Sequence, residues 1–170
     1  FAGFLIIGSL KIIGSQHSIS NESLVLGVVL FAMANFSGRL GWGYLSDRIE
    51  ASLTIFLALM FQALSIISLI LFPLTDTTYL TLSVLIGFGF GGNFVLFAKE
   101  SAQVFGIKNL GLVYPYVFIG TAFAGIAGPF SGGFLFDISG TYYYAIILAS
   151  TMSVLGSFIF LYHFFITQKK

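Results

Sequence analysis

The sequence contains no cysteine and very few charged side chains, and both shortages limit what the protein can be. Without cysteine the chain has no disulfide framework and no thiolate metal site. Only 8% of its residues are charged, whereas soluble domains carry about 25%. A water-soluble fold could not cover its surface with so few charges, so the expected solvent is a lipid bilayer.

The few polar residues exclude several function classes. The net charge is +1 and no basic cluster occurs beyond Lys169-Lys170, so nucleic-acid binding is not expected. His17 and His163 lie near opposite ends of the chain without ligand-spaced partners, and we interpret them as interfacial histidines. No Ser-His-Asp set, paired intramembrane acids or metal cluster can be assembled, so the sequence predicts neither an enzyme nor a cofactor.

Long apolar runs make up most of the chain, and 58% of its residues are hydrophobic. Their lengths of about 20 residues suit helices that cross about 30 Å of hydrocarbon, whereas barrel strands would alternate over about 10 residues. We therefore predict an all-α membrane protein, a polytopic bundle of transmembrane helices that satisfy their own backbone hydrogen bonds. The expected spans are about 24–44, 53–72, 79–98, 110–134 and 142–166, after a partial helix at 1–8.

The segments between these spans are also informative. The chain starts with neither an initiator Met nor a basic region, so residues 1–13 are not interpreted as a signal peptide. They are typical of the end of a helix whose start is missing, so we interpret the chain as a piece of a longer protein. A polar connection is expected over 9–23, where Ser20 or Asn21 can cap the next helix. A polar loop is expected over 99–109.

Basic residues segregate to one side of the predicted bundle. That side receives Arg39, Arg48, Lys99, Lys108, Lys169 and Lys170. The other side receives only Lys11. The first side, which includes the C-terminus, is therefore expected in the cytoplasm. Trp42, Tyr79 and the run Tyr142-Tyr143-Tyr144 fall near span ends, where interfacial aromatic residues are common.

Glycines and prolines mark the third and fourth spans. Gly87-x-x-x-Gly91 and Gly128-x-x-x-Gly132 form small-residue faces that let helix backbones approach closely. Pro115 and Pro129 are expected to bend or break the fourth span.

Arg39 is the basic residue placed within a complete span, about one turn inside the predicted boundary. A charge there is costly and usually faces the protein interior or a water-filled cavity, where a guanidinium can bind a carboxylate through two parallel hydrogen bonds. An arginine that extends to the headgroups is the alternative. Asn35 lies one turn earlier on the same helix face. Other hydrogen-bonding side chains in the spans are Gln62, Asn93, Tyr114, Tyr116 and Thr121, each of which alone also fits helix packing.

A charged turn, Gly43-Tyr44-Leu45-Ser46-Asp47-Arg48, separates the first two complete spans. Gly41 and Gly43 remove side chains where two helices must touch, and Asp47 can reach a cation or the N-terminal N–H groups of a neighbouring helix. The turn would then be a latch on the cytoplasmic side. A solvated turn is the alternative interpretation.

This turn resembles the loop signature of the major facilitator superfamily, G-x-L-[A/S]-D-[R/K]-x-G-R. The spacing Arg39-x-x-x-Gly43-x-x-x-Asp47 is similar to its monocarboxylate and oxalate/formate branch, as are Gly91-Gly92-Asn93-Phe94 and Phe105-Gly106. The resemblance covers essentially the whole chain and implies the C-terminal half of a transporter, from the end of its seventh helix to its twelfth. It also implies a cytoplasmic turn and a contact between Arg39 and a substrate carboxylate.

The chain departs from the family pattern at five positions. Glu50 replaces the Gly of the loop motif, and Ala51 and Ser52 stand where it has a basic residue, which weakens the latch. Asn35 replaces an acid found in some proton-coupled monocarboxylate carriers, which puts proton coupling in question. Val117 falls where oxalate carriers place a lysine, so a dicarboxylate substrate is disfavoured.

The sequence thus predicts a multi-pass integral membrane protein, half of a major facilitator fold, that transports a small organic anion, above all a monocarboxylate, by alternating access. The candidate substrate-binding residues are Arg39, Asn35, Asn93, Tyr114 and Thr121, and the candidate gating residues are Gly43, Asp47 and Arg48. The expected partners are the lipid bilayer, the anion and the missing N-terminal half of the transporter. The alternative is a non-transporting, truncated membrane subunit that packs against other subunits.

Overall fold

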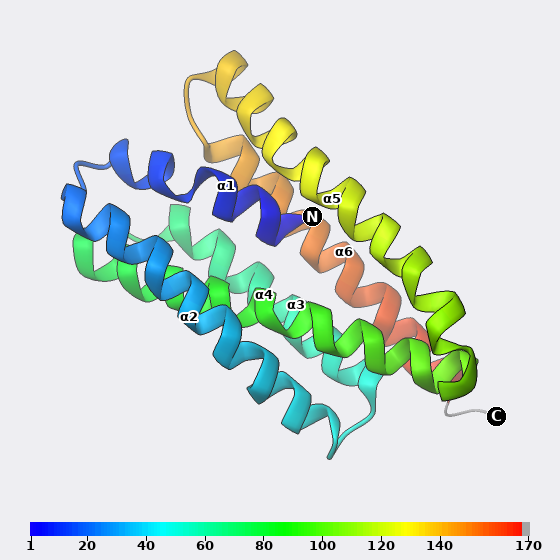
Figure 1. Cartoon of the computed structure of the whole chain (residues 1–170). Coiled ribbons are helices and arrows are strands. Elements are labelled where there is room, and N and C mark those ends of the chain that lie inside the picture. Colours follow the sequence, from blue (N-terminus) through cyan, green and yellow to red (C-terminus); the bar gives the residue numbers. More distant parts are fainter. Residues whose placement is uncertain (168–170) are drawn as a thin grey trace.

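The computed structural model describes residues 1–167, and these form an all-helical bundle without a strand (Figure 1). Its elements are α1 (Ala2–Ser15), α2 (Asn21–Ser46), α3 (Ala51–Leu71), α4 (Asp76–Phe105), the short 3-10 helix η1 (Ile107–Asn109), α5 (Leu110–Ser139) and α6 (Tyr143–Thr167). Five of the helices are long and apolar enough to cross a membrane. The predicted all-α class is confirmed.

Side-chain caps fix where α2 and α4 begin. The Ser20 hydroxyl accepts a hydrogen bond from the Ser23 N–H at 3.3 Å, so Ser20 is the cap of α2. Thr75 and Thr78 form a reciprocal capping box at the start of α4. Asp76 Oδ1 accepts a hydrogen bond from the Ser20 N–H at 3.0 Å. These contacts hold the first turns of α2 and α4 together.

Three helices extend beyond their predicted bounds, because the polar residues that were expected to end them find partners. The helix predicted at 1–8 continues to Ser15, whose hydroxyl donates to the main chain of the preceding turn. The helix predicted at 79–98 continues to Phe105, since Lys99 and Glu100 contact side chains of neighbouring elements. The helix predicted at 110–134 continues to Ser139. The predicted connections at 9–23 and 99–109 are correspondingly shorter.

The two prolines of α5 do not break it, contrary to one of the two expected outcomes. Pro115 and Pro129 both lie inside one continuous helix. The helix ends instead at Gly140, which has a φ of 71° that residues with a side chain rarely adopt. Gly106, which follows α4, also has a positive φ of 81°, but its ψ of 145° differs from the left-handed helical conformation of Gly140.

The helices pack through the small-residue faces predicted from the sequence. The most extensive contact joins α2 to α4, and others join α3 to α6 and α1 to α5 (Figure 1). A Cβ atom built on Gly87 or Gly91 would lie 2.4 or 2.1 Å from a main-chain oxygen of α2. One built on Gly128 would lie 2.9 Å from a main-chain nitrogen of α1. Both interfaces therefore depend on glycine.

Three aromatic residues interpreted as interfacial are core residues instead, and one of them is Tyr142, which is 5% exposed. Tyr79 is fully buried, and its hydroxyl donates to the main chain of α1. Trp42 is buried and donates from Nε1 to the Phe88 carbonyl oxygen at 3.1 Å. Tyr143 and Tyr144 are exposed, as interfacial residues should be. Trp42 and Tyr79 stabilise helix packing.

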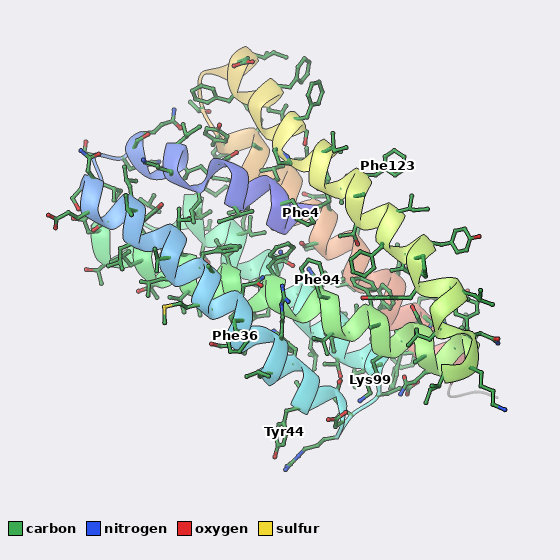
Figure 2. The ribbon with its side chains drawn as sticks, in the orientation of Figure 1. Phe4, Phe36, Tyr44, Phe94, Lys99 and Phe123 are labelled. Carbon is green, nitrogen blue, oxygen red and sulfur yellow. The ribbon has the colours of Figure 1, made fainter. Side chains whose placement is uncertain are left out.

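The outer faces of α2 and α5 are apolar and exposed. Figure 2 shows Phe36 of α2 and Phe123 of α5 pointing away from the bundle. Other exposed apolar residues of these helices are Val29, Met33, Leu40, Ile119, Ile126 and Phe130. Such extended apolar faces suit contact with lipid or with another apolar protein surface.

The two ends of the bundle carry different numbers of basic residues. We call the end at which α2 finishes and α3 begins the turn end. Among the described residues it carries Arg48, Lys99 and Lys108. Lys11 lies on α1 toward the opposite end. Lys169 and Lys170, which also supported the predicted orientation, lie outside the described residues.

Candidate functional site

Arg39 projects from α2 beside α4. Its Nη2 donates a 3.4 Å hydrogen bond to Asn35 Oδ1 on the same helix face, and its Cζ lies 4.9 Å from the centre of the Phe94 ring. The side chain is exposed in this chain. Of the five N–H donors of a guanidinium, the bond to Asn35 uses one, so the others can bind an anion.

The position of Arg39 depends on the glycine contact between α2 and α4. A Cβ atom on Gly91 would lie 3.1 Å from the Arg39 main-chain nitrogen as well as 2.1 Å from the Asn35 oxygen. A Cβ atom built on Gly38 would lie 2.2 Å from the Phe88 carbonyl oxygen. The segment of α2 that carries both candidate residues is therefore held directly against the backbone of α4.

Asn93 of α4 pairs with Gln62 of α3, and each amide keeps an unpaired atom. Asn93 Nδ2 donates to Gln62 Oε1 at 3.3 Å. Asn93 Oδ1 and Gln62 Nε2 are buried without a hydrogen-bond partner among the described residues. Because a buried unpaired amide group costs about 1–3 kcal/mol, this pair is a candidate for a further polar contact.

A cavity of about 260 Å³ lies between α1, α4 and α5. Three of the predicted binding residues line it: Asn93, Tyr114 and Thr121. Arg39 and Asn35 do not line it. Arg39 lies next to it through Phe94, whose ring lines the cavity and also contacts the guanidinium. Asn35 is linked to this arrangement through its hydrogen bond with Arg39.

Tyr114 and Thr121 use part of their hydrogen-bonding capacity within the chain. The Tyr114 hydroxyl donates to the Phe94 carbonyl oxygen at 3.0 Å, which joins α5 to α4 at the cavity. The Thr121 hydroxyl donates to the Val117 carbonyl oxygen at 3.4 Å on its own helix. Tyr116 is exposed and points elsewhere. Tyr114 and Thr121 can still accept hydrogen bonds from a ligand.

The sequence reasoning missed the aromatic walls of the cavity. They are formed by Phe1, Phe4, Phe90, Phe94, Phe97 and Phe118. Figure 2 shows Phe4 and Phe94 close together where α1 meets α4. The residues at positions 90, 94 and 97 follow the spacing of one helix face, so this signal was present in the sequence.

At the turn end, Asp47 forms an ion pair with Lys99 of α4. Lys99 Nζ lies 2.7 Å from Asp47 Oδ1 and 3.2 Å from Ser46 Oγ, and it also donates to the Ser46 carbonyl oxygen (Figure 2). The carboxylate thus contacts a cation, one of the two partners expected from the sequence. Since 73% of the Asp47 side chain is exposed, this pair contributes only about 0.2–1 kcal/mol.

The other two gating candidates make no interhelical contact of this kind. A Cβ atom on Gly43 would meet only Val95, at an ordinary 3.4 Å, so packing does not require glycine there. Gly41, by contrast, lies close to the Phe88 ring, at 2.9 Å for a built Cβ atom. Arg48, in the turn after α2, donates to the hydroxyl of Tyr44 in the last turns of α2, and its guanidinium lies over that ring. The expectation that helix contact requires Gly43 was therefore wrong.

Comparison with known proteins agrees with this arrangement. The sequence profile of the Major Facilitator Superfamily matches residues 1–170. The chain is 29% identical over 120 residues to the uncharacterized MFS-type transporter YhjX of Escherichia coli (strain K12), a match that covers 70% of this chain and 30% of that protein. It is 26% identical over 132 residues to the oxalate:formate antiporter of Oxalobacter formigenes, covering 75% of this chain and 31% of that protein.

The chain thus spans about 30% of the length of the curated relatives that it matches. Members of the matching family are transporters and not enzymes. Because the family profile covers every residue, and five helices have the length and apolarity of membrane spans, the chain is a multi-pass integral membrane protein that belongs to the major facilitator superfamily.

Proposed function

We propose that the chain forms part of a secondary transporter that carries a small organic anion, with a monocarboxylate as the substrate class. The observation that carries the proposal is Arg39, whose free N–H donors lie beside a cavity with aromatic walls. The guanidinium fork matches a carboxylate, and if the rest of the transporter covers this exposed side chain, exclusion of water would strengthen a charge-assisted pair.

The charge around the cavity favours one carboxylate over two. No charged side chain is among the described residues that line the cavity, and Val117 occupies the α5 side of it. Arg39 is the cation beside it, so a single carboxylate would be neutralised and a second would not. The amide pair Asn93–Gln62 and the hydroxyl of Thr121 can bind uncharged polar groups of the substrate.

Transport would proceed by alternating access, in which two helical halves rock around a site near the bilayer midplane. This chain would supply one half and the rest of the transporter the other. The basic residues at the turn end support a cytoplasmic location for that end and for the C-terminus. The Asp47–Lys99 pair would help to stabilise one of the two states.

Two variants of Arg39 in the full transporter test the proposal. Purified protein in liposomes would be assayed for uptake of labelled formate, acetate and oxalate, at equal abundance of each variant. Loss of one partner of a buried charge pair costs about 2–5 kcal/mol, which is roughly 30-fold or more in affinity. Arg39→Ala should therefore abolish uptake. Arg39→Lys keeps the positive charge but loses the two parallel hydrogen bonds of the guanidinium, so its rate of uptake should be well below that of the parent.

Lys11→Ala is the control, since Lys11 is exposed and lies far from the cavity. It should transport as the parent does. If both Arg39 variants take up these anions at near-parent rates, Arg39 extends to the headgroups and the substrate proposal fails.

A further inference from the structure

A second polar cluster lies at the turn end, away from the cavity with aromatic walls. It joins Ser52 at the start of α3, Glu100 of α4 and His163 of α6. The Ser52 hydroxyl donates to Glu100 Oε1 at 2.7 Å and lies 3.1 Å from His163 Nδ1, and that nitrogen is 3.2 Å from Glu100 Oε1. Three helices that are distant in sequence therefore meet at these side chains.

Glu100 is a buried carboxylate that the substrate proposal does not use. The residue is 8% exposed and Ser52 is 1% exposed. The second oxygen of Glu100, Oε2, is buried without a hydrogen-bond partner among the described residues. A buried carboxylate with an unpaired oxygen is costly unless a nearby positive charge compensates it. His163 is the group in contact that can supply that charge.

Counting hydrogens shows where a proton must be. Ser52 has one hydroxyl hydrogen, and its shorter contact gives that hydrogen to Glu100 Oε1. The two oxygens nearest His163 Nδ1 then both act as acceptors, so Nδ1 must carry a hydrogen for the cluster to be satisfied. A second proton on the ring makes it an imidazolium, which forms a charge-assisted bond with the carboxylate.

The cavity beside the cluster contains acidic groups and the imidazole of His163. This cavity has a volume of about 340 Å³ and is lined by Glu50, Ser52, Glu100, Gln103, Val104, His163, Ile166 and Thr167. Its titratable groups are thus two glutamates and one histidine, with no lysine or arginine among the described residues that line it. Lys99, next to Glu100 on α4, is engaged by Asp47. Protons can enter and leave through this cavity because 43% of the His163 side chain is exposed.

We propose that Ser52, Glu100 and His163 form a proton-binding site that fastens α6 to α3 and α4 when the imidazole is charged. Binding adds one proton from water to the His163 ring, and release returns it to water. Imidazole groups ordinarily change charge between about pH 5 and pH 8. The contact is therefore strong while the ring carries its charge and weaker once the ring has released the proton. This inference goes beyond the proposed substrate and does not depend on it.

A buried thiol reports whether α6 stays in place. Ser157 of α6 is fully buried and its hydroxyl lies 3.8 Å from Met60 Sδ of α3, so Ser157→Cys places a thiol between the two helices. This chain has no other cysteine, and any cysteine elsewhere in the full transporter would be replaced. The rate of alkylation by N-ethylmaleimide at position 157 would be divided by the rate for Ile107→Cys, an 82% exposed position. The ratio removes the pH dependence that the two thiols share, and the His163→Gln variant measures what remains because a buried thiol ionises less readily than an exposed one.

The ratio should rise about tenfold between pH 5.5 and pH 8.5, the size expected when a charge-assisted bond becomes a neutral one. In His163→Gln and in Glu100→Gln the ratio should be high at both pH values and should rise far less than in the parent, while His17→Gln should behave as the parent. A flat ratio in the parent overturns the proposal, as does a rise in His163→Gln that equals the rise in the parent. The parent measurement requires no change in the cluster, so the test holds even if Glu100→Gln does not fold.

Discussion

Replacing Gly91 with alanine should destabilise the protein and displace the candidate anion-binding residue at the same time. The added methyl carbon would lie 2.1 Å from the Asn35 carbonyl oxygen and 3.1 Å from the Arg39 main-chain nitrogen. Both are backbone atoms of a continuous helix, so no side-chain rotation can relieve the clash. The axes of α2 and α4 must move apart, and Arg39 must move with α2.

The expected loss of folding free energy in Gly91→Ala follows from the cost of overpacking, which is typically about 1–3 kcal/mol. The higher helix propensity of alanine offsets about 1 kcal/mol of that cost. Because this is the closest contact with backbone of any glycine among the described residues, we expect a net loss of stability toward the upper part of the range. Uptake of a carboxylate should fall as well, since separation of the helices removes the Arg39 guanidinium from the Phe94 ring.

Two glycines provide matched controls on the same pair of helices and on α5. A Cβ atom on Gly43 would make an ordinary contact of 3.4 Å, and one on Gly120 would have no atom within 4 Å. Gly43→Ala and Gly120→Ala should therefore be as stable as the parent or slightly more stable. The assay is thermal unfolding of the purified full transporter, followed by size-exclusion chromatography with fluorescence detection. If Gly91→Ala unfolds at the same temperature as Gly43→Ala, the backbone contact deduced here is absent.

Two further predictions concern the turn end. Asp47→Asn and Lys99→Gln should each change the transport rate by about two- to fivefold with little effect on substrate affinity. The reason is that an exposed ion pair of about 0.2–1 kcal/mol can shift the balance between the two transport states. An unchanged rate would leave a solvated turn as the better interpretation. Tags placed at Asp76 and at the C-terminus should be accessible from opposite faces of the membrane, as measured by labelling of intact and permeabilised cells, and labelling from the same face would contradict the predicted topology.

The helices and their contact faces could be predicted because both leave a periodic signal. Apolar runs gave the helices, and Gly87, Gly91, Gly128 and Gly132 gave the faces through which backbones meet. The helix ends were predicted less well. Lys99 and Glu100 suggested a loop as isolated residues, yet each has a partner on another element. Whether a charge ends a helix depends on a partner distant in sequence, which local reasoning does not provide.

Only part of the candidate site could be predicted, because rare residue types stand out in a sequence and common ones do not. Asn93, Tyr114 and Thr121 stand out because polar residues are rare in an apolar span, and all three line the cavity. Phe94 was noted only as part of a family motif, and its place between the cavity and Arg39 was not predicted, because phenylalanine is common throughout the chain. In the same way, Trp42 matched the pattern of an interfacial residue, and only its bond to the Phe88 carbonyl shows that it belongs to the core.

One element, α4, connects all of these contacts through different faces. Gly87 and Gly91 touch the backbone of α2, while Phe90, Phe94 and Phe97 line the cavity. Near its end, Lys99 reaches Asp47 and the adjacent Glu100 reaches Ser52 and His163. Because a helix with unbroken backbone hydrogen bonds moves nearly as a rigid rod, a small rotation of α4 would alter the Phe94–Arg39 contact and both polar contacts together. We therefore predict that Gly91→Ala, which displaces α4, changes both the Ser157→Cys alkylation ratio and carboxylate uptake; a change in only one of the two measurements would contradict a common movement of α4.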